Sequence, residues 1–288
     1  MQDIRIMMRI GFVGAGKVGF SLGRYFHLKG VPVVGYCSLY ERDAREAAAL
    51  TGSRVFSAPG DLAAACDCLF LTVPDNDIAA VWSQFDHTDI TGKLFCHCSG
   101  SLASAVLAHA VERGGGACSL HPLMAIPDRL HSHTLLERAV FFLEGTEPHR
   151  ERLRALIAGL GNDVQVLPSD KKALYHCAAV FVSNFVVALA HTGEQLFQSC
   201  GLTGATPALF QLLQANAESV RAYGPAAALT GPVERGDTAT IQQHLASLGG
   251  DDRELYALLA RKLADLASAK HPDRDYGPTL DILGDRQP

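Results

Sequence analysis

Short apolar runs alternate with helical stretches over the first 166 residues. The runs are rich in aliphatic and aromatic residues and almost uninterrupted by polar ones, and they lie at residues 9–13, 31–36, 68–73, 93–97, 117–120, 139–143 and 164–167. Continuous apolar runs are typical of strands that are covered on both faces. Helical patterns at residues 17–29 and 41–50 separate the first strands. This alternation predicts an α/β domain with a parallel, doubly wound sheet.

The pattern changes after Pro168. Ser169 and Asp170 are suitable N-cap residues for a long helix that reaches about Cys200 and ends at Gly201. Further helices are expected at residues 205–223, 238–248 and 253–270, and no strand pattern of similar strength follows Leu167. We therefore expect a dinucleotide-binding-type domain over residues 1–167 and an all-helical domain over residues 168–288, whose last segment, 271–288, forms an extended arm.

The long helix is apolar on almost every side between residues 178 and 189. Such a helix is expected to be buried on most of its faces. A domain of roughly 120 residues has little material to enclose it, so we expect a homodimer that forms through the helical domain.

Composition excludes several classes of partner. Hydrophobic residues make up 48% and charged residues 19%, which supports a folded core, and the net charge is −5. Neither part of the chain has a basic excess, so we expect no nucleic-acid partner and no anionic membrane surface. The first 16 residues lack the zones of a signal peptide, and Ser183 and Asn184 interrupt the most apolar region. We therefore expect a cytoplasmic protein that does not span a membrane.

Eight cysteines in 288 residues do not indicate a disulfide scaffold. The segment Cys96-His97-Cys98 lies in a predicted strand, which would direct His97 to the face opposite the two cysteines. Metal ligands must converge on one point, so we expect no metal site.

A glycine-rich motif follows the first predicted strand, and it reads Gly14-Ala15-Gly16-Lys17-Val18-Gly19. The spacing is G-x-G-x-x-G, and a helix is predicted to begin inside it, which is the context of a dinucleotide-binding loop. Gly14 would allow the tight turn, Gly16 would let the backbone approach a diphosphate, and Gly19 would allow close packing of helix and strand. The helix N-terminus would supply free N–H groups to the phosphates. The alternative is a plain glycine turn.

The end of the second strand indicates which dinucleotide binds. An acidic residue there would hold the 2′-hydroxyl of an adenosine ribose, but the sequence has Ser38 at this point and Arg42 four residues later. Both could bind a 2′-phosphate, so NADP is favoured and NAD is less expected. Alternatively, Glu41 and Arg42 are only surface charges of the next helix.

Three later strands also end in residues that could face a ligand, since ligands of open α/β sheets lie beyond the carboxyl ends of the strands. The backbone of Thr72, Val73 and Pro74 could face the cofactor ribose. Ser99 would lie near the nicotinamide, and His121 could bind a substrate oxygen or relay a proton. Each of these residues could instead serve only a turn or a cap.

Polar residues on the long apolar helix suggest a catalytic role. Lys172, His176 and Ser183 fall within about 40° of each other at 100° per residue, with Asn184 at the edge. We expect this stripe to lie in an inter-domain cleft. His176 is the first candidate for the proton donor there, and Lys172 and His121 are the alternative candidates. Lys172 is close to the helix start and could simply be solvated.

A shaped turn follows Leu229 and ends at Asp237. Within it, Arg235 could clamp a substrate carboxylate or phosphate, or it could pair with Asp237 or with a neighbouring subunit. Ser99, Asn184 and Arg235 would thus orient a substrate.

Several segments together resemble the Rossmann-like oxidoreductases that carry the DUF2520 domain. They are Ile10 to Gly19, His97-Cys98-Ser99-Gly100, Leu120-His121-Pro122, Tyr175 to Ala179, Ser183-Asn184 and Thr230 to Asp237. The family is similar to the superfamily of pyrroline-5-carboxylate reductase, 6-phosphogluconate dehydrogenase and 3-hydroxyisobutyrate dehydrogenase. The resemblance implies a Rossmann domain, a helical dimerisation domain like that of 6-phosphogluconate dehydrogenase, and NAD(P)-linked reduction, but no particular substrate.

One departure from that superfamily affects the expected chemistry. Its hydroxyacid dehydrogenases have a catalytic lysine four residues before an asparagine, whereas here Lys172 precedes His176 and Lys171 precedes Tyr175. The expected function is therefore broader: an NADP-dependent oxidoreductase that transfers a hydride between the nicotinamide and a small carbonyl or imine. The alternatives are a pyrroline-5-carboxylate-like imine reductase and a non-catalytic NADP-binding sensor or partner protein.

Overall fold

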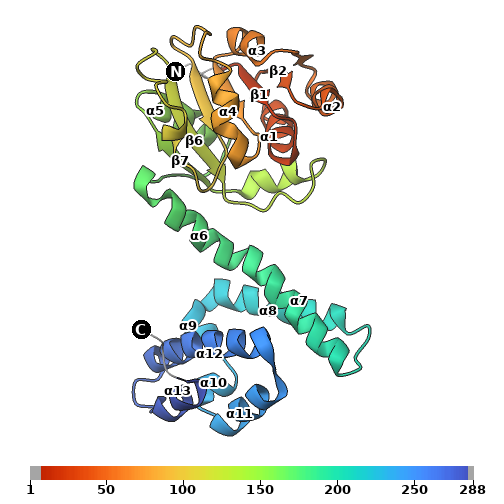
Figure 1. The fold of residues 1–288 in the computed structure, drawn as a ribbon, viewed down its shortest axis with the longest axis vertical. Helices are drawn as coiled ribbons and strands as arrows, with labels where there is room; N and C mark the ends of the chain where they lie inside the picture. The colour runs from red at the N-terminus through yellow and green to blue at the C-terminus, as the bar shows by residue number, and fades with distance from the viewer. Residues whose placement is uncertain (1–7, 285–288) are drawn as a thin grey trace. The chain divides into compact units, whose positions relative to one another are not determined.

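The computed structural model describes residues 8–284 and divides into two compact units, Met1–Ser183 and Asn184–Pro288 (Figure 1). Residues 1–7 and 285–288, which include the first and last residues of the two predicted domains, lie outside the described residues. The division falls later than Pro168, because the helix that follows Pro168 packs with the first unit.

The first unit is built on one eight-stranded sheet with the strand order β3-β2-β1-β4-β5-β6-β7-β8. Its strands are β1 Ile10–Val13, β2 Val33–Cys37, β3 Arg54–Val55, β4 Cys68–Leu71, β5 Leu94–His97, β6 Gly116–Pro122, β7 Phe141–Gly145 and β8 Val164–Val166. The order reverses between β1 and β4, so a crevice for a ligand is expected beyond the carboxyl ends of these two strands.

The sequence pattern predicted a parallel sheet, and the structure departs from that prediction at one pair of strands. β6 and β7 pair in antiparallel fashion, with Leu120 opposite Leu143, while every other pair is parallel. Residues 123–140, between these two strands, contain one 3-10 helix, Ser132–Arg138, and no α-helix. A parallel pair needs a crossover connection, usually helical, so this segment instead returns the chain beside β6 in the opposite direction.

Helices cover both faces of the sheet, as expected for a doubly wound fold (Figure 1). They are α1 Lys17–Leu28, α2 Glu41–Thr51, α3 Pro59–Ala65, α4 Ile78–Ser83 and α5 His149–Gly159. A further helix, α6 Lys172–Val182, runs away from the sheet and buries only Lys172. Two apolar clusters fill the space between helices and sheet. Alternate strand residues enter different clusters: Phe70 lies in one and Leu69 and Leu71 in the other, which identifies the clusters with the two faces.

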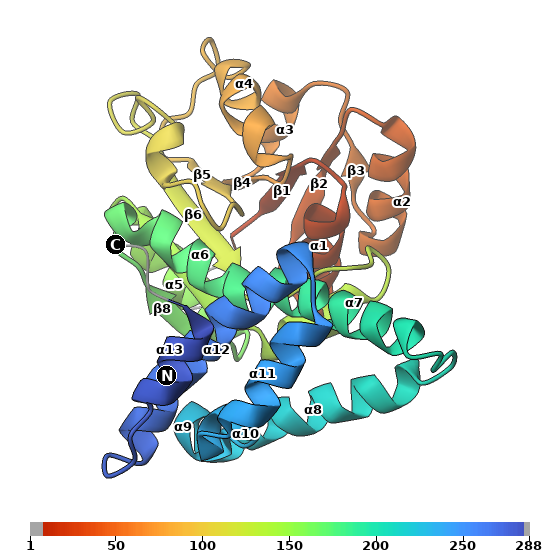
Figure 2. The ribbon, with the colours of Figure 1, turned by 60° about the horizontal axis from the view of Figure 1, so that its bottom comes forward.

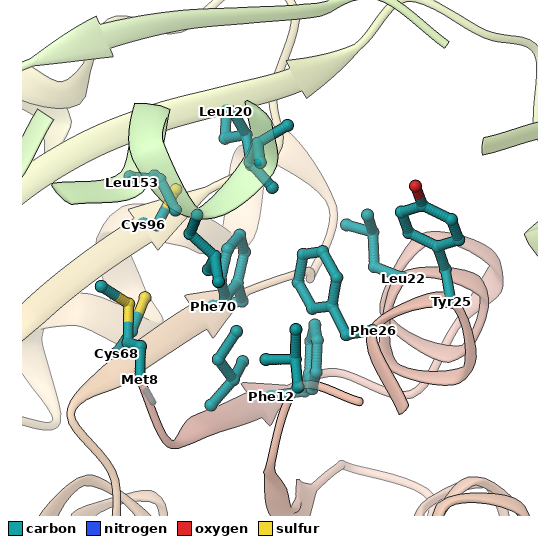
Figure 3. Close-up of a cluster of buried hydrophobic side chains, with 14 of the residues drawn as sticks. Met8, Phe12, Leu22, Tyr25, Phe26, Cys68, Phe70, Cys96, Leu120 and Leu153 are labelled. Carbon is teal, nitrogen blue, oxygen red and sulfur yellow. The ribbon is translucent and has the colours of Figure 1, made fainter. Parts of the chain in front are cut away.

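The centre of the first cluster is aromatic (Figure 3). The ring of Phe12 stacks on those of Tyr36 and Phe70 at centroid distances of 5.3 and 5.4 Å, and Phe26 from α1 meets Phe70 edge-on at 5.8 Å. These contacts join β1 and α1, which flank the glycine-rich motif, to β2 and β4. The core therefore fixes the position of that motif.

The second unit is helical. It consists of α7 Asn184–Ser199, α8 Thr206–Tyr223, α9 Pro225–Ala228, α10 Pro232–Arg235, α11 Thr238–Ser247, α12 Gly250–Lys270 and α13 Gly277–Leu283. α7 and α8 form a helical hairpin (Figure 2). A smaller core joins α10 to α13 and includes Val233, Ile241, Ala264 and Leu283.

The prediction of an extended arm after His271 is wrong for the described part of that segment. Residues Gly277–Leu283 form α13, with Pro278 in the first turn, and bury Thr279 and Leu283. The apolar residues Leu280, Ile282 and Leu283 join the core of the second unit. Their burial outweighs the high proline and aspartate content that suggested an arm.

The predicted single helix up to Cys200 is interrupted at Ser183, which separates α6 from α7. The helical segment Ser169–Ser199 is long and apolar enough to cross a membrane by length and composition alone. The prediction that it is buried on most sides is wrong within this chain, because Val182 and Val187 are exposed and no part of its most apolar window is buried. The absence of a membrane partner stays a prediction.

Candidate functional site

The glycine-rich motif forms a tight turn between β1 and α1. Gly14 has φ +101°, a conformation that side chains with a Cβ rarely adopt, and an added Cβ would lie 2.7 Å from the carbonyl oxygen of Thr72. The Gly14 N–H donates to the Cys37 carbonyl at 2.8 Å, and the Thr72 hydroxyl donates to the Gly14 carbonyl at 2.7 Å. The turn is therefore tied to both neighbouring strands, β2 and β4.

The three glycines of the motif meet different surroundings. A Cβ at Gly19 would overlap the Gly14 carbonyl oxygen and the Thr72 hydroxyl, so this glycine allows α1 to pack against the turn. A Cβ at Gly16 would have nothing within 4 Å among the described residues, and its φ of −71° suits any residue. Packing within the chain therefore explains Gly14 and Gly19 but not Gly16.

The space beside Gly16 adjoins the start of α1. Gly16 is the N-cap residue and offers no side chain to the first N–H groups of the helix. Such groups, together with the helix dipole, attract anions. Around them, Ala15 is buried, Lys17 is exposed, and Val18 is half-buried against the core. The loop therefore fits a diphosphate that approaches its backbone closely.

The first residue after β2 is a serine and not an acidic residue. Ser38 is half-buried directly after β2, and Arg42 lies in the first turn of α2 with 81% of its side chain exposed. Arg42 contacts Asp43 at 3.4 Å and Glu46 at 3.9 Å, while the neighbouring Glu41 is paired with Arg45 at 2.6 Å. The hydroxyl and the guanidinium can both bind an anion at this edge.

A polar network joins the ends of β4 and β5. The Ser99 hydroxyl donates to Asp75 at 2.6 Å and accepts from the backbone N–H of Leu102 at 2.9 Å, and Ser101 donates to the same carboxylate oxygen at 3.0 Å. Asp75 follows Pro74, and the half-buried Val73 packs against the second apolar cluster. The network fixes the turn after β5 relative to the end of β4.

His97, the last residue of β5, is hydrogen-bonded to the backbone of this turn. It is fully buried; its Nδ1 accepts from the Ser99 N–H at 3.3 Å, so its Nε2 carries the proton and donates to the Ala103 carbonyl at 3.2 Å. Burial lowers the pKa of His97 to about 4, which keeps the ring neutral at pH 7. Cys96 is buried on the opposite face, in the first apolar cluster. Among residues 8–284, no group of three or more His, Cys, Asp or Glu side chains is placed to hold a metal.

Lys172 is buried, contrary to the interpretation that it is solvated. Only 2% of it is exposed, and its Nζ donates to the Ser99 carbonyl at 2.8 Å and to the Ser119 hydroxyl at 2.7 Å. Its position at the start of α6 suggested solvation, but α6 begins against the ends of β5 and β6. Burial lowers the pKa of Lys172, and the charge of Glu144 opposes that effect. The lysine therefore holds the turn after β5 in place.

Glu144 is a buried residue that sequence reasoning missed. Its carboxylate accepts from the backbone N–H of Ser104, from the Ser104 hydroxyl at 3.1 Å and from the Ser169 hydroxyl at 2.6 Å. Ser169 precedes Lys172, so this carboxylate also anchors the start of α6. A single acidic residue in the otherwise apolar run at residues 139–145 was the signal that could have identified it.

Two histidines and a tyrosine lie together beside Gly100. His121 Nδ1 is 2.8 Å from the Tyr175 hydroxyl, and the rings of His121 and His176 meet edge-on at 6.2 Å. A Cβ at Gly100 would meet both histidine rings, so this glycine makes room for them. Burial, followed by the positive charge of Lys172, lowers the pKa of His121 to about 4, and burial raises the pKa of Tyr175. Tyr175 was not among the predicted site residues.

Three further predicted site residues, Ser183, Asn184 and Arg235, lie at the helix break or in the second unit. Ser183 lies at the helix break, where its hydroxyl donates to the Ala179 carbonyl at 2.7 Å, so the expected stripe with Lys172 does not form on one continuous helix. Asn184 and Arg235 belong to the second unit, and Arg235 is 3.9 Å from Asp237. Their role in orienting a substrate, and the expected inter-domain cleft, stay predictions.

Comparisons with known proteins agree with this architecture. The family described as "Rossmann-like domain" matches residues 1–122, and the family "Domain of unknown function (DUF2520)" matches residues 139–263. A search of curated proteins finds no match.

Solved structures show the same fold over most of the chain. Protein TM1727 from Thermotoga maritima is 26% identical with a TM-score of 0.72, covering 91% of this chain and 99% of its own. A Bacteroides fragilis protein provisionally named as an NADP oxidoreductase is 23% identical with a TM-score of 0.71, covering 90% and 98%. An imine reductase from Myxococcus stipitatus in complex with NADP+ is 17% identical with a TM-score of 0.64, covering 96% and 99%. The chain thus carries a Rossmann-like domain followed by a DUF2520 domain.

Proposed function

We propose that the protein is an NADP-dependent oxidoreductase that transfers a hydride between C4 of the nicotinamide and a small carbonyl or imine. The observation that carries the proposal is the open space beside Gly16, at the uncapped start of α1. A glycine there is explained by a ligand that approaches the backbone, and diphosphate is the group that such a loop binds. The similarity to an NADP oxidoreductase and to an imine reductase with NADP+ supports the same cofactor.

The cofactor would extend along the carboxyl ends of the strands. The N-terminus of α1 would hold the diphosphate, and Ser38 and Arg42 would hold the 2′-phosphate. The backbone of Thr72 to Pro74 would face a ribose, and Ser99 would lie near the nicotinamide. The cofactor supplies the hydride, so the protein needs only to position the reactants and handle one proton.

The histidines beside Gly100 are the candidates for that proton. His121 is neutral at pH 7, because its pKa is about 4, and it shares a hydrogen bond with the Tyr175 hydroxyl. One member of this pair can therefore donate a hydrogen bond to a substrate oxygen or nitrogen, either His121 through Nε2–H or Tyr175 through its hydroxyl, but neither holds an extra proton. His176 stays the first choice as proton donor, while Lys172, whose Nζ is directed at Ser99 and Ser119, acts as a positioning residue.

An imine reductase is the alternative that a specific observation favours. A protonated imine brings its own proton to the site, so reduction does not require a charged acid, and His121 is held neutral. The fold similarity to the Myxococcus stipitatus imine reductase supports this alternative. The third possibility, a protein that binds NADP without turnover, predicts saturable binding and no consumption.

The test is NADPH oxidation measured across a panel of keto acids, aldehydes and cyclic imines. We expect turnover with at least one class, and a His176→Ala variant that loses at least about tenfold in kcat with unchanged NADPH affinity. His87→Ala, at an exposed histidine in the turn after α4, is the matched control and should keep wild-type turnover. Saturable NADPH binding without turnover of any class would contradict the enzyme proposal and support a sensor.

A further inference from the structure

Arg129 reaches the carboxylates that also contact Arg42. Arg129 lies between β6 and β7, and its guanidinium donates to Asp43 at 3.0 Å and forms an ion pair with Glu46 at 3.0 Å. Arg42 contacts the same two residues at 3.4 and 3.9 Å. Two arginines from different segments therefore share two carboxylates on the first turns of α2.

The contacts of Arg129 are the shorter and the less solvated of the two sets. Its side chain is 24% exposed, against 81% for Arg42, and its guanidinium lies over the ring of Phe20 at 4.6 Å from the centroid. Ion pairs away from bulk water are screened less than exposed ones. Asp43 and Glu46 therefore pair mainly with Arg129, and Arg42 remains available to another anion.

The segment around Arg129 is anchored on α1. Arg24 donates to the Leu130 carbonyl at 2.8 Å, and the backbone of Leu130 and the side chain of His131 are held by Asp128. Arg129 is thus presented to α2 by a fixed segment that follows β6, far from α2 in the sequence. Arg24 contacts the backbone next to Arg129, but of these two arginines only Arg129 contacts the carboxylates of α2.

We propose that Arg129 sets the preference for a phosphorylated adenosine ribose, because it neutralises Asp43 and Glu46 beside the end of β2. This rests on the proposed function, in which Arg42 and Ser38 hold the 2′-phosphate. Two arginines and two carboxylates sum to zero charge. Without Arg129 the cluster carries one net negative charge, which repels the 2′-phosphate, and Arg42 is drawn toward Asp43 and Glu46. Arg129 is a positioning residue that acts through these groups.

The expected effect is selective for the nucleotide. The loss of one positive charge near a doubly charged phosphate on a solvated surface changes affinity by roughly 3- to 10-fold. NADH has no 2′-phosphate, so its affinity should change by less than about twofold. A purely structural role of Arg129 would instead weaken both nucleotides to the same extent.

The experiment measures NADPH and NADH dissociation constants by fluorescence titration of the full chain. Arg129→Met should weaken NADPH selectively, Arg129→Lys should retain most of the preference, and Arg24→Gln should leave the NADPH-to-NADH ratio unchanged. The selective loss should shrink at high salt, because the interaction crosses solvent.

A second background keeps the test decisive if Arg129→Met folds poorly. In an Asp43→Asn, Glu46→Gln variant the charges that Arg129 neutralises are absent, so NADPH should bind at least as tightly as to wild type. Adding Arg129→Gln to that background should lower the NADPH-to-NADH ratio by the effect of one charge but not below the wild-type ratio, because no carboxylate is left without a cation. Equal loss of both nucleotides, or an unchanged ratio in Arg129→Met, would overturn the inference. Failure of wild type to bind either nucleotide would instead contradict the proposed function itself.

Discussion

The two units of the chain bury their apolar side chains to very different extents. In the first unit, two clusters fill both faces of the sheet and include fully buried aromatic residues such as Phe12, Phe70 and Phe95. In the second unit, the core of α10 to α13 is small, and α7 and α8 expose large apolar residues such as Val187, Leu212 and Tyr223. The sheet and the helices α1 to α5 thus enclose two apolar clusters, whereas both helices of the hairpin expose large apolar residues.

The exposed apolar residues of the hairpin form a candidate interaction surface. Large exposed apolar patches are rare on monomers and usually mark interaction surfaces. Most of the exposed large apolar residues of the second unit lie on α7 and α8, while Leu258, Leu259 and Leu263 lie on α12. We propose that a second copy of the chain covers α7 and α8, which makes the helical domain the interface of a homodimer. Substitutions in either unit can test this contrast.

The largest expected effect on stability is that of a Phe→Ala substitution in the first unit, compared with a Phe→Ala substitution in the second. Phe70→Ala removes a fully buried ring and should cost about 3–5 kcal/mol of unfolding free energy, while Phe210→Ala, 50% exposed on α8, should leave the first unit unchanged. The chain has one tryptophan, Trp82, buried in the first unit, so its fluorescence reports the unfolding of that unit. Equal shifts of the Trp82 urea transition in both variants would contradict the contrast.

The buried His97 predicts a pH dependence that belongs to the first unit. Its pKa is about 4 in the folded protein, against 6.5 for a solvated histidine, so the unfolded state binds more protons between these values. Stability should therefore rise with pH from 4 to 6.5, with roughly 3 kcal/mol from this residue. In His97→Gln the slope of unfolding free energy against pH, followed by Trp82, should flatten by about one proton. An unchanged slope would show that the ring is not held neutral.

The smallest expected effect tests the hairpin surface. Leu212 is 62% exposed on α8, and Leu212→Ser should weaken self-association by roughly 2 kcal/mol, or about 30-fold, if a second copy covers it. Gln211→Ser, on the neighbouring exposed position of the same helix, is the control and should have little effect. Light scattering against dilution measures the mass. A wild-type mass equal to the 30.8 kDa chain at micromolar concentration would contradict the dimer.

Local patterns predicted most of the fold, and long-range contacts account for most of the errors. Apolar runs located seven of the eight strands, and the glycine spacing located the turn before α1, because both depend on residues close in sequence. The direction of β7 and the helix after Tyr276 depend on which distant surface each segment packs against. No local pattern carries that information.

The same distinction explains the candidate site. The strand ends that hold Ser99 and His121 could be predicted, because ligands of α/β sheets lie beyond the carboxyl ends. The burial of Lys172 beneath Ser99 and the pairing of Tyr175 with His121 depend on how α6 meets the sheet. Spacing along a helix indicates on which face of the helix a residue lies, but not which residue of another element it contacts.

The central claim is that the backbone N–H groups at Gly16 bind the diphosphate of the cofactor. It is tested most directly by NADPH titration of wild type and Gly16→Val, with the Trp82 urea transition as the folding control. A Cβ at Gly16 meets nothing within 4 Å among the described residues, so the variant should fold with a stability change under about 1 kcal/mol. It should nevertheless lose NADPH affinity by about 100-fold or more, since the side chain takes the space of the phosphates. Wild-type affinity in Gly16→Val, or no affinity of the wild-type protein for NADPH or NADH, would contradict the claim.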